Sequence, residues 1–534
     1  MDTLTFILYN LAFVLGILNL NDELRRDLMM LQQNSYRNER FARWMNESSD
    51  NFTWWRICGA VIFVVCVFKG SSHLAAMALV LLFSAAHWIK LRRAKYKKPL
   101  VMTMRALRIN ITSYVLAAIV ILGSSLIWHS GYYSGIYSAA TATLACYCCS
   151  HLFLFAANIL LAPVEKAINK KYYDDAASRL ASMPDLKIIG ITGSYGKTTT
   201  KHYLHRILSE QFETLMTPGS YNTTLGVIRT VREMLKPYHE VFIVEMGAKQ
   251  PGDIKEICDL VHPGSCIITA VGPQHLESFK TIENVRATKF ELADALPPAG
   301  MAVINNDFEM IANRPVGNCR AIRYAVKNTV GADYVAENII YSPLGTEFDA
   351  VSTFDGHRIH LSTRLVGECN ISNLLAAVAI ARQMGVPDEK IRYAVEKIEQ
   401  VEHRLSIKRT PGGITIIDDA FNSNPVGSAM ALDVLAAMTP GKRILITPGM
   451  IELGDKQYDL NFKFGEKAAN SCDVAIVVGH YNRDAIVNGL RKGGMDEKAI
   501  RPADSFAEAQ TILASIAAAG DTVLYENDLP DTFK

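Results

Sequence analysis

The sequence predicts an α-helical membrane region followed by two α/β domains. Apolar runs dominate the chain up to about residue 165, whereas the remainder of the 534 residues alternates short apolar runs with helical stretches. Such alternation is typical of a mostly parallel sheet covered by helices. The pattern begins near Leu186 and restarts near Ile407, so we expect two such domains.

Five apolar stretches are candidate membrane spans, because a span needs about 20 residues of helix. They cover about 3–20, 54–69, 73–90, 111–128 and 136–162. In the alternative with four spans, the first stretch is an interfacial helix. We expect a membrane region of about five helices at 1–165 and a linker at 166–185.

The distribution of Lys and Arg among the loops predicts the orientation. The loop "KLRRAKYKK" (90–98) is strongly basic, the loop after the first span is rich in Arg, and "HSGYYSG" (129–135) has neither residue. Because basic loops face the cytoplasm, we expect a multi-pass protein of the inner (cytoplasmic) membrane with cytoplasmic α/β domains. The balanced charge, 55 Lys and Arg against 53 Asp and Glu, indicates no nucleic acid partner.

Short apolar, β-branched runs predict the strands of the two α/β domains. In the first domain, at 186–404, they are "LKIIGIT", "EVFIVEMG", "SCIITAVG" and "MAVINN". In the second domain, at 405–534, they are "ITIIDDA", "RILITPGM", "DVAIVVGH" and "DTVLYEN". The second domain is therefore expected to be a doubly wound, Rossmann-like fold.

A glycine-rich turn follows the first of these strands. In "GITGSYGKTTT", Gly193, Gly196, Lys197 and Thr198 connect a strand to a helix. Backbone N–H groups at such a helix start can bind phosphates, with Lys197 on the β/γ-phosphates and the Thr198 hydroxyl on magnesium. The spacing is shorter than in the usual P-loop, which has a Gly where Ile191 stands. We expect a P-loop domain that binds ATP and Mg²⁺; the alternative is a purely structural turn.

"GITGSYGKTTT" resembles the nucleotide loop of the Mur ligases, in which this shorter spacing is normal. Other motifs follow in the family's order: "TPGSYNTTLGV", "VEMGAKQPGDI", "GPQHLESF", "VRATKFEL", "LVGECNISNLLAAVA", "EHRL" and "IDDAFNSNP". The resemblance covers about 187–471. It implies a set of ATP-binding residues: Gly193, Ser194, Tyr195, Gly196, Lys197, Thr198, Thr199, Asn370, Asn373, Arg404 and Asp419.

The same resemblance implies catalytic, metal and substrate residues. The catalytic set is Lys197, Glu245, His275 and Lys289. The magnesium ligands are Thr198, Glu245, His275 and, if it is carbamylated, Lys289. The substrate-binding residues are Asn222, Thr223, Asn422 and Asn424. Each also has a structural interpretation, such as a strand-end carboxylate for Glu245, a helix-capping residue for His275 or a solvated cation for Lys289.

The Asn-x-Asn-Pro form of "IDDAFNSNP" and the motif "PGMIELGD" resemble the branch that adds D-alanyl-D-alanine. The resemblance implies a ligase that activates a carboxylate as an acyl phosphate and joins it to an amine such as D-alanyl-D-alanine. Two departures concern the acceptor: membrane spans replace the family's uridine-nucleotide-binding domain, and "VLYENDLPDTFK" lacks the branch's Lys-Gly-Ser element.

We therefore expect a membrane-anchored, ATP-dependent carboxylate–amine ligase of cell-wall precursor synthesis. Its acceptor would be a soluble or lipid-linked precursor, with membrane lipid as a further partner. One alternative is a ligase of another branch, acting on a lipid-linked precursor or making polyglutamate. The other is a membrane transporter ATPase, although the chain has no LSGGQ-like signature and no apolar strand ending in Asp-Glu.

Overall fold

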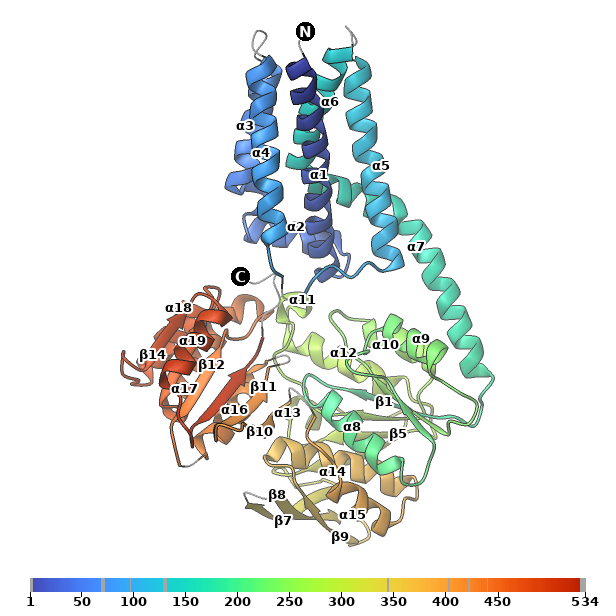
Figure 1. The fold of residues 1–534 in the computed structure, drawn as a ribbon. Coiled ribbons are helices and arrows are strands. Elements are labelled where there is room, and N and C mark those ends of the chain that lie inside the picture. Colours follow the sequence, from blue (N-terminus) through green and yellow to red (C-terminus); the bar gives the residue numbers. More distant parts are fainter. Residues whose placement is uncertain are drawn as a thin grey trace. The chain divides into compact units, whose positions relative to one another are not determined.

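A computed structural model gives the fold (Figure 1). It describes residues 3–68, 73–96, 98–127, 132–342, 345–401, 404–420, 423–438 and 440–528. The chain divides into two compact units, an N-terminal helical region that extends to Asn169 and an α/β unit from Lys170 to Asp528.

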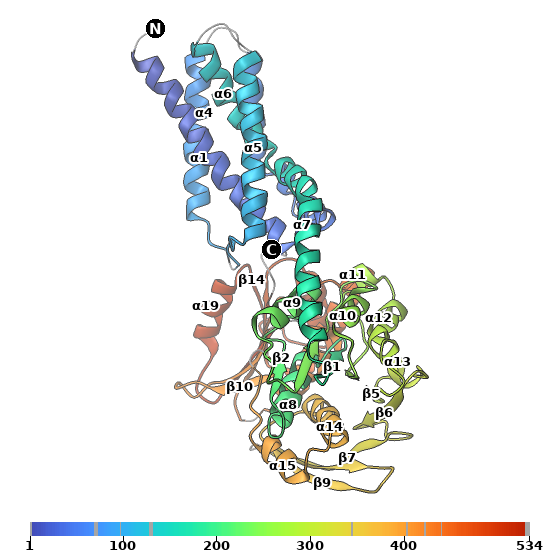
Figure 2. The ribbon, with the colours of Figure 1, turned by 90° about the vertical axis from the view of Figure 1, so that its right-hand side faces the viewer.

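Long helices that lie side by side form the N-terminal helical region (Figures 1 and 2). Helix α1 packs against α4 and α6, and α5 packs against α6. The elements are α1 (Thr3–Gln33), α2 (Asn38–Glu47), η1 (Asp50–Phe52), α3 (Trp54–Phe68), α4 (His73–Arg93), α5 (Met104–Ile127), α6 (Tyr132–Cys148) and α7 (Ser150–Ala181). Among the residues that the structure describes, four segments are long and apolar enough to cross a membrane: Thr5–Gln33, His73–Arg93, Met104–Leu126 and Ser150–Ala181.

The helix boundaries differ from the predicted spans in two places. The stretch expected as one span at 136–162 is two helices that meet at Cys149. Arg56 explains the break, because its guanidinium donates to the carbonyls of Tyr147 (3.3 Å) and Cys148 (3.0 Å), which end α6. Helix α1 continues past the predicted end of its span. Helix α3 matches the stretch predicted at 54–69, and with 15 residues it is shorter than the four segments named above.

The expected linker at 166–185 is largely helical, because α7 continues to Ala181. Ala176 and Leu180 on this helix pack into the core of the α/β unit. Arg232 also binds Asp175, with 2.6 Å between the charged atoms. The end of α7 is therefore part of the folded α/β unit.

A nine-stranded sheet forms the central domain of the α/β unit. Its order is β2-β3-β1-β4-β5-β6-β7-β8-β9, parallel from β2 to β7 and antiparallel from β7 to β9. The strands are β1 (Lys187–Thr192), β2 (Thr214–Met216), β3 (Val241–Glu245), β4 (Ser265–Ile268), β5 (Met301–Asn305), β6 (Arg320–Ala325), β7 (Tyr334–Ser342), β8 (Gly345–Ser352) and β9 (Arg358–Thr363). The four predicted strands are present as β1, β3, β4 and β5.

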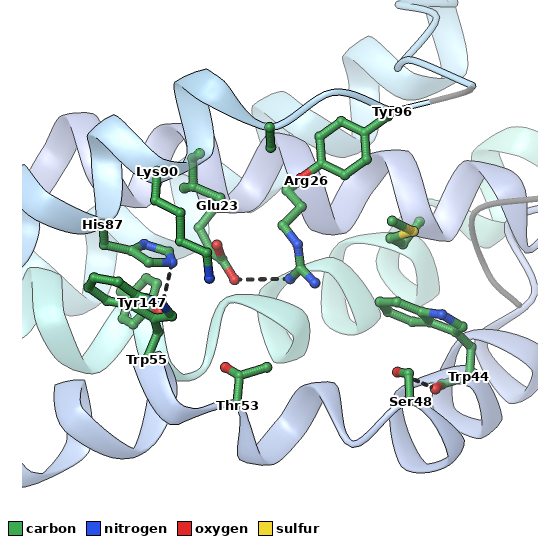
Figure 3. A pocket seen from close by; sticks show the side chains of 13 residues that line it. Glu23, Arg26, Trp44, Ser48, Thr53, Trp55, His87, Lys90, Tyr96 and Tyr147 are labelled. Carbon is green, nitrogen blue, oxygen red and sulfur yellow. Dashed lines mark hydrogen bonds and ion pairs between the residues drawn. The ribbon is translucent and has the colours of Figure 1, made fainter. Parts of the chain in front are cut away.

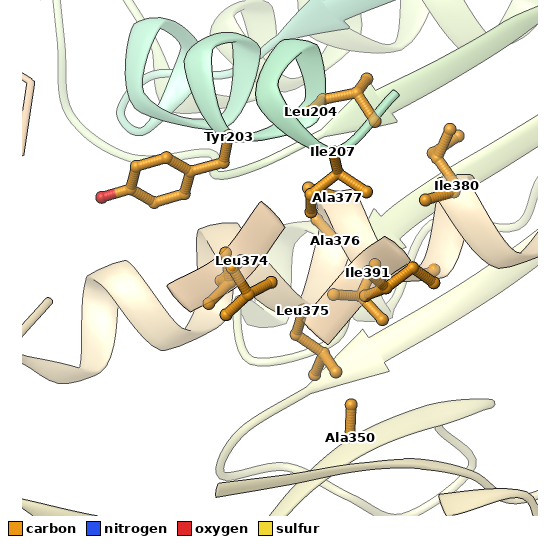
Figure 4. Packing of buried hydrophobic residues seen from close by; sticks show 14 of the residues in the cluster. Tyr203, Leu204, Ile207, Ala350, Leu374, Leu375, Ala376, Ala377, Ile380 and Ile391 are labelled. Carbon is orange, nitrogen blue, oxygen red and sulfur yellow. The ribbon is translucent and has the colours of Figure 1, made fainter. Parts of the chain in front are cut away.

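Helices cover both faces of this sheet. On one face lie α8 (Lys197–Leu208), α14 (Glu368–Gln383) and α15 (Asp388–Glu396), whose apolar side chains interdigitate (Figure 4). On the other lie α9 (Thr224–Glu233), α10 (Asp253–Val261) and α12 (Ile282–Asp294). Two one-turn helices, α11 (Leu276–Phe279) and α13 (Glu309–Ala312), lie in the connections.

The C-terminal domain is built on a six-stranded sheet of order β10-β11-β15-β12-β13-β14, parallel except for β10. Its strands are β10 (Ser406–Arg409), β11 (Thr415–Asp419), β12 (Arg443–Thr447), β13 (Val474–Val478), β14 (Ile500–Ala503) and β15 (Thr522–Glu526). Its helices are α16 (Pro425–Ala436), η2 (Gly454–Lys456), α17 (Gln457–Ser471), α18 (Arg483–Lys492) and α19 (Phe506–Ile516). The four strands predicted for this domain correspond to β11, β12, β13 and β15.

The order of the central sheet determines where a ligand can bind. Strand β1 pairs with β3 on one side and with β4 on the other. The chain therefore adds β2 and β3 on one side of β1 and then crosses to the other side, where it adds β4 and the strands that follow. Ligands of open parallel sheets bind at such a switch point, beyond the carboxyl ends of the strands. The glycine-rich loop follows β1 and therefore lies at this position.

Candidate active site

The loop between β1 and α8 requires glycine at two positions. Gly193 has φ +154°, and a Cβ there would lie 2.0 Å from the Thr269 hydroxyl and 2.9 Å from the nitrogen of Ala270. Gly196 has φ +78°, and its Cβ would lie 2.5 Å from the amide oxygen of Asn373. A larger residue at either position would displace the loop.

Polar contacts from neighbouring elements hold the loop in place. The backbone N–H of Ser194 donates to the carbonyl of Ala270 at 2.7 Å, and its hydroxyl lies 3.1 Å from the nitrogen of Gly272. Thr269 donates its hydroxyl to the carbonyl of Tyr195. The Tyr195 hydroxyl is buried beside Gly272, where a Cβ would overlap it.

Two asparagines of the predicted ATP-binding set form hydrogen bonds with α8. Asn373 accepts a hydrogen bond of 3.1 Å from Thr200, the residue after Thr199 in the first turn of α8. Asn370 accepts one of 2.8 Å from the hydroxyl of Tyr203. Both come from the start of α14, so this helix positions the phosphate-binding loop.

Lys197 is the first residue of α8, and its ammonium lies over the loop. Its Nζ donates to the carbonyl of Gly193 at 2.7 Å. Burial lowers the pKa of Lys197 to about 8; Glu245 opposes this shift and Arg404 adds to it. The lysine is thus a cation at neutral pH whose charge is poorly solvated, which favours its binding to an anionic phosphate.

Glu245, at the end of β3, is the best-connected carboxylate of the site. Its Oε1 accepts from the Thr198 hydroxyl at 3.2 Å and from the Asn222 amide at 3.0 Å. Its Oε2 forms an ion pair with Lys201 at 3.0 Å, and both side chains are fully buried. Burial alone would raise the pKa of Glu245, but Lys201 and Lys197 outweigh it and hold the pKa below its usual value.

Lys201 was not predicted from the sequence, although a signal existed. It follows Lys197 by four residues, and residues four apart lie on the same face of a helix. Besides its ion pair, its Nζ donates to the carbonyl of Gly219 at 2.6 Å. Lys201 therefore connects α8, β3 and the loop after β2.

His275 has a carboxylate partner from the other domain. It precedes α11 with φ +52°, and its Nδ1 contacts the carboxylate of Glu452 in the loop after β12. Glu452 also has a positive φ, +61°. Burial lowers the pKa of His275, against the opposing effect of Glu452.

Lys289 lies on α12 and is buried rather than solvated. Only 2% of its surface is exposed. Burial, with a contribution from the charge of Lys197, lowers the pKa of Lys289 well below its usual value. The interpretation of this residue as a solvated surface cation is therefore wrong.

Arg404 and Asp419 lie where the two α/β domains meet. The pKa of Arg404 is lowered by burial, against the opposing charges of Asp419 and Glu245. Asp419 ends β11 and accepts from the backbone N–H of Leu405 at 3.0 Å. Burial raises the pKa of Asp419 to about 6.

Glu526 is a second carboxylate beside Asp419 that the sequence analysis did not single out. It ends β15, where it is the register partner of Asp419. The Ser423 hydroxyl donates to it, and burial followed by the charge of Asp419 raises its pKa well above the usual value.

Two of the residues predicted to bind substrate cap helices. Thr223 precedes α9 and accepts from the nitrogen of Gly226 at 3.3 Å, and Asn424 precedes α16 and accepts from that of Gly427 at 2.8 Å. Asn222 binds Glu245 and so belongs to the charged site. Asn422 lies outside the described residues.

Comparison with known proteins identifies the family. Residues 191–381 match the Mur ligase middle domain, and residues 403–525 match the Mur ligase glutamate ligase domain. The UDP-N-acetylmuramoyl-tripeptide–D-alanyl-D-alanine ligase of Escherichia coli is 30% identical over 310 residues, which cover 58% of this chain and 68% of that enzyme. The chain belongs to the Mur ligase family.

Other relatives lead to the same branch of the Mur ligases. The Bacillus subtilis ligase of the same name is 28% identical over 50% of this chain and 57% of its own length. MurF from Acinetobacter baumannii superposes with a TM-score of 0.60 and 26% identity, covering 67% of this chain and 77% of that one. MurF from Thermotoga maritima, solved with ADP, superposes with a TM-score of 0.59 and 25% identity, covering 67% of this chain and 80% of that one.

Mur ligases are ATP-dependent ligases of peptidoglycan synthesis that typically use magnesium, and the donors at this site fit that ion. Mg²⁺ commonly takes one or two protein oxygens and completes its shell with water and substrate phosphates. The oxygens of Thr198 and Glu245 converge in this way. Within the described part of the chain, no three His, Cys, Asp or Glu side chains gather as a metal-binding group.

Proposed function

We propose that this protein is a membrane-anchored, ATP-dependent ligase that joins the carboxylate of a cell-wall precursor to an amine such as D-alanyl-D-alanine. Three features support the proposal. The first is the charged site at the switch point, in which Lys197, Thr198, Glu245 and Lys201 surround the phosphate-binding loop. The second is the likeness to D-alanyl-D-alanine-adding relatives. The third is the four long apolar helices.

The proposed reaction has two steps. A carboxylate oxygen of the acceptor attacks the γ-phosphorus of ATP, and the bond to the β-phosphate oxygen breaks, releasing ADP. The amine nitrogen then attacks the acyl carbon, phosphate leaves with the C–O bond electrons, and the nitrogen loses a proton to give the amide. Both steps bring negatively charged or electron-rich groups together, so cations must lie near the transferred phosphoryl group.

The residues of this chain would divide these tasks. The loop N–H groups and Lys197 hold the phosphates, while Thr198 and Glu245 hold a magnesium ion that neutralises phosphate charge. Lys201 keeps Glu245 ionised. Lys289 would act as a carbamate, since its low pKa favours the uncharged amine that carbamylation requires.

The acceptor distinguishes this chain from its relatives. An N-terminal helical region precedes the matched domains, and Glu526 lies in the segment where the branch usually carries its Lys-Gly-Ser element. A lipid-linked precursor is therefore the second candidate acceptor, beside a soluble uridine-linked one. Membership of the Mur ligases argues against a transporter ATPase.

The test uses the purified full-length protein with ATP, Mg²⁺, UDP-muramoyl tripeptide and D-alanyl-D-alanine, and mass spectrometry identifies the products. We expect the pentapeptide product together with ADP and phosphate. In the Lys197→Ala variant the rate should fall by about 10²–10³, because the γ-phosphate loses its main side-chain cation. ATP hydrolysis without amide formation for any acceptor would refute the proposed ligase function.

A further inference from the structure

The N-terminal helical region contains a cavity of about 380 Å³ (Figure 3). Side chains from α1, α2, α3, α4 and α6 line it, together with residues just after α2, just before α3 and just after α4. Sites for small ligands usually measure about 300–1,000 Å³. The residues that matter most here are Glu23, Arg26, Trp55, Lys90, Tyr96 and Tyr147.

Glu23 places an unsatisfied carboxylate oxygen at this cavity. Only 2% of the residue is exposed. Its Oε1 accepts from Arg56 at 2.8 Å and from Arg26 at 3.2 Å. Its Oε2 is buried and has no hydrogen-bond partner among the residues that the structure describes. Leaving a buried polar oxygen without a partner is costly, so a ligand that supplies a hydrogen-bond partner for this oxygen would be bound favourably.

The guanidinium groups nearby are already engaged. Arg26 binds both carboxylate oxygens of Asp50 and one of Asp27. Arg56 binds Asp27 and the carbonyls that end α6. Three carboxylates thus share two guanidinium groups, and this part of the cavity favours a hydrogen-bond donor over an anion.

Aromatic side chains form another part of the lining. Trp55 and Tyr147 flank His87, at ring-centroid distances of 5.0 and 4.9 Å, and Tyr96 lies beyond Arg26 in the view of Figure 3. Aromatic rings combine a broad apolar face with polar edges. A sugar has the matching chemistry, because C–H groups cover its faces and hydroxyl or amide donors surround its rim.

Lys90, an exposed residue, adds a positive charge to the lining of the cavity. Its Nζ lies 5.1 Å from the centroid of the Trp55 ring, and it begins the basic segment 90–98. Glu23 lies 20 residues beyond Thr3, about 30 Å along α1, which is the thickness of a bilayer's hydrocarbon core. The cavity would therefore lie at the level of lipid headgroups, where Lys and Arg attract phosphate.

We propose that this cavity binds the phosphorylated sugar headgroup of a membrane lipid. The sugar donates to the free oxygen of Glu23 and packs on Trp55, while the phosphate faces Lys90. The inference deepens the proposed function and rests on it only for the step from binding to ligation, in which the bound lipid would carry the acceptor carboxylate.

Binding can be measured without any ligase reaction. The full-length protein in detergent is titrated with a short-chain polyprenyl pyrophosphate that carries one N-acetylated amino sugar, and native mass spectrometry follows the complex. Three other ligands are compared: the same polyprenyl pyrophosphate without the sugar, the uridine-diphosphate sugar without the lipid, and phosphatidylglycerol. We expect the sugar-bearing lipid to bind more tightly than all three.

Paired variants test the two proposed contacts to the ligand. Lys90→Gln and Glu23→Gln should each weaken binding about tenfold or more, as expected for a lost contact to a charged group. Lys95→Gln and Glu47→Gln remove the same charges from exposed positions in segment 90–98 and in α2, and should leave the affinity unchanged. Lys90→Gln keeps the test valid if Glu23→Gln, which disturbs the Arg56 ion pair, fails to fold.

Two results of the binding measurements would overturn the inference. One is equal binding of phosphatidylglycerol and the sugar-bearing lipid, with Lys90→Gln no weaker than Lys95→Gln, which would indicate general attraction to anionic lipid. The other is tighter binding of the soluble uridine-linked sugar. Ligation of a soluble acceptor without lipid binding would leave the proposed function intact and refute this inference. Lipid binding without ligation of any acceptor would support this inference and refute the proposed function.

Discussion

The ion pair between Lys201 and Glu245 is the most consequential contact at the residue scale. Both partners are fully buried, and the carboxylate also accepts hydrogen bonds from Thr198 and Asn222. Removing one member of such a pair leaves an uncompensated charge in the interior. The pair therefore contributes both to the fold and to the ionised state of Glu245.

Lys201→Met should destabilise the α/β unit by about 3–5 kcal/mol. Thermal unfolding of the full-length protein measures this as a lower transition temperature. The matched control is Lys255→Met, which breaks an exposed ion pair with Asp259 on α10. Exposed pairs contribute little, so the control should unfold like the wild type. Equal transition temperatures for both variants would contradict a stabilising role of the buried pair.

The pKa of Lys197 predicts how nucleotide affinity depends on pH. The pKa of this lysine is lowered to about 8, so the free protein loses this charge as the pH rises through that value. A bound phosphate favours the protonated form. ATP affinity should therefore fall above about pH 8 and be accompanied by proton uptake, which calorimetry in buffers of different ionisation enthalpy detects.

The Lys197→Ala variant is the control for this pH dependence. It should bind ATP weakly and lack the decline above about pH 8, because the titrating group is gone. If the decline persists in the variant, another group causes it.

Residues in short motifs could be predicted from the sequence, whereas long-range partners could not. Gly193, Gly196 and Lys197 could be recognised because a loop between a strand and a helix fixes their geometry locally. Glu452 pairs with His275 from 177 residues away. Only the folded tertiary structure brings these two residues together, so no local sequence pattern could have indicated that they pair.

At the scale of elements, apolar runs predicted most of the parallel strands, although β2, β6 and β14 were missed. Buried parallel strands are continuously apolar, which made β1, β3, β4 and β5 recognisable. The antiparallel extension β7–β9 was not predicted. Its exposed face carries polar residues, and a bulge between Glu337 and Ile340 interrupts the alternation.

The helical region shows a similar limit. Composition predicted apolar helices but not where they break, because the α6–α7 boundary depends on Arg56 from a distant helix. The same composition could not indicate that Glu23, Asp27 and Arg56 are buried together. The sequence analysis therefore used the Arg residues after the first span only to predict the orientation.

The loop after β12 offers a prediction at this scale. Glu452 joins the C-terminal domain to His275, which is a predicted magnesium ligand. Mutating the carboxylate partner of a metal-binding histidine typically lowers metal affinity or activity by about 10–100-fold. Glu452→Gln should raise the magnesium concentration needed for half-maximal ligation by about that factor. Glu497→Gln, at an exposed site of the same domain, should not. If the magnesium requirement of Glu452→Gln is unchanged, Glu452 contributes only to the packing of the two domains.

For the whole molecule, the predicted topology can be tested directly. In a Cys149→Ser background, which removes an exposed thiol, Ser130→Cys should react with an impermeant thiol reagent in intact cells. Lys95→Cys should react only after lysis, because the positive-inside rule places its loop in the cytoplasm. The opposite labelling would place the ATP site outside the cell and contradict the proposed ligase function.

The position of β15 has a consequence for the order in which the chain folds during synthesis. This strand lies between β11 and β12, yet it is made after β14. Until Glu526 leaves the ribosome, β11 pairs only with β10 and β12 only with β13, so each has one open edge that can associate with other chains. The nine-stranded sheet, by contrast, is complete at Thr363. Translation thus delivers a finished nucleotide-binding domain while its partner domain is still open, and chaperones would be needed chiefly for the last stage.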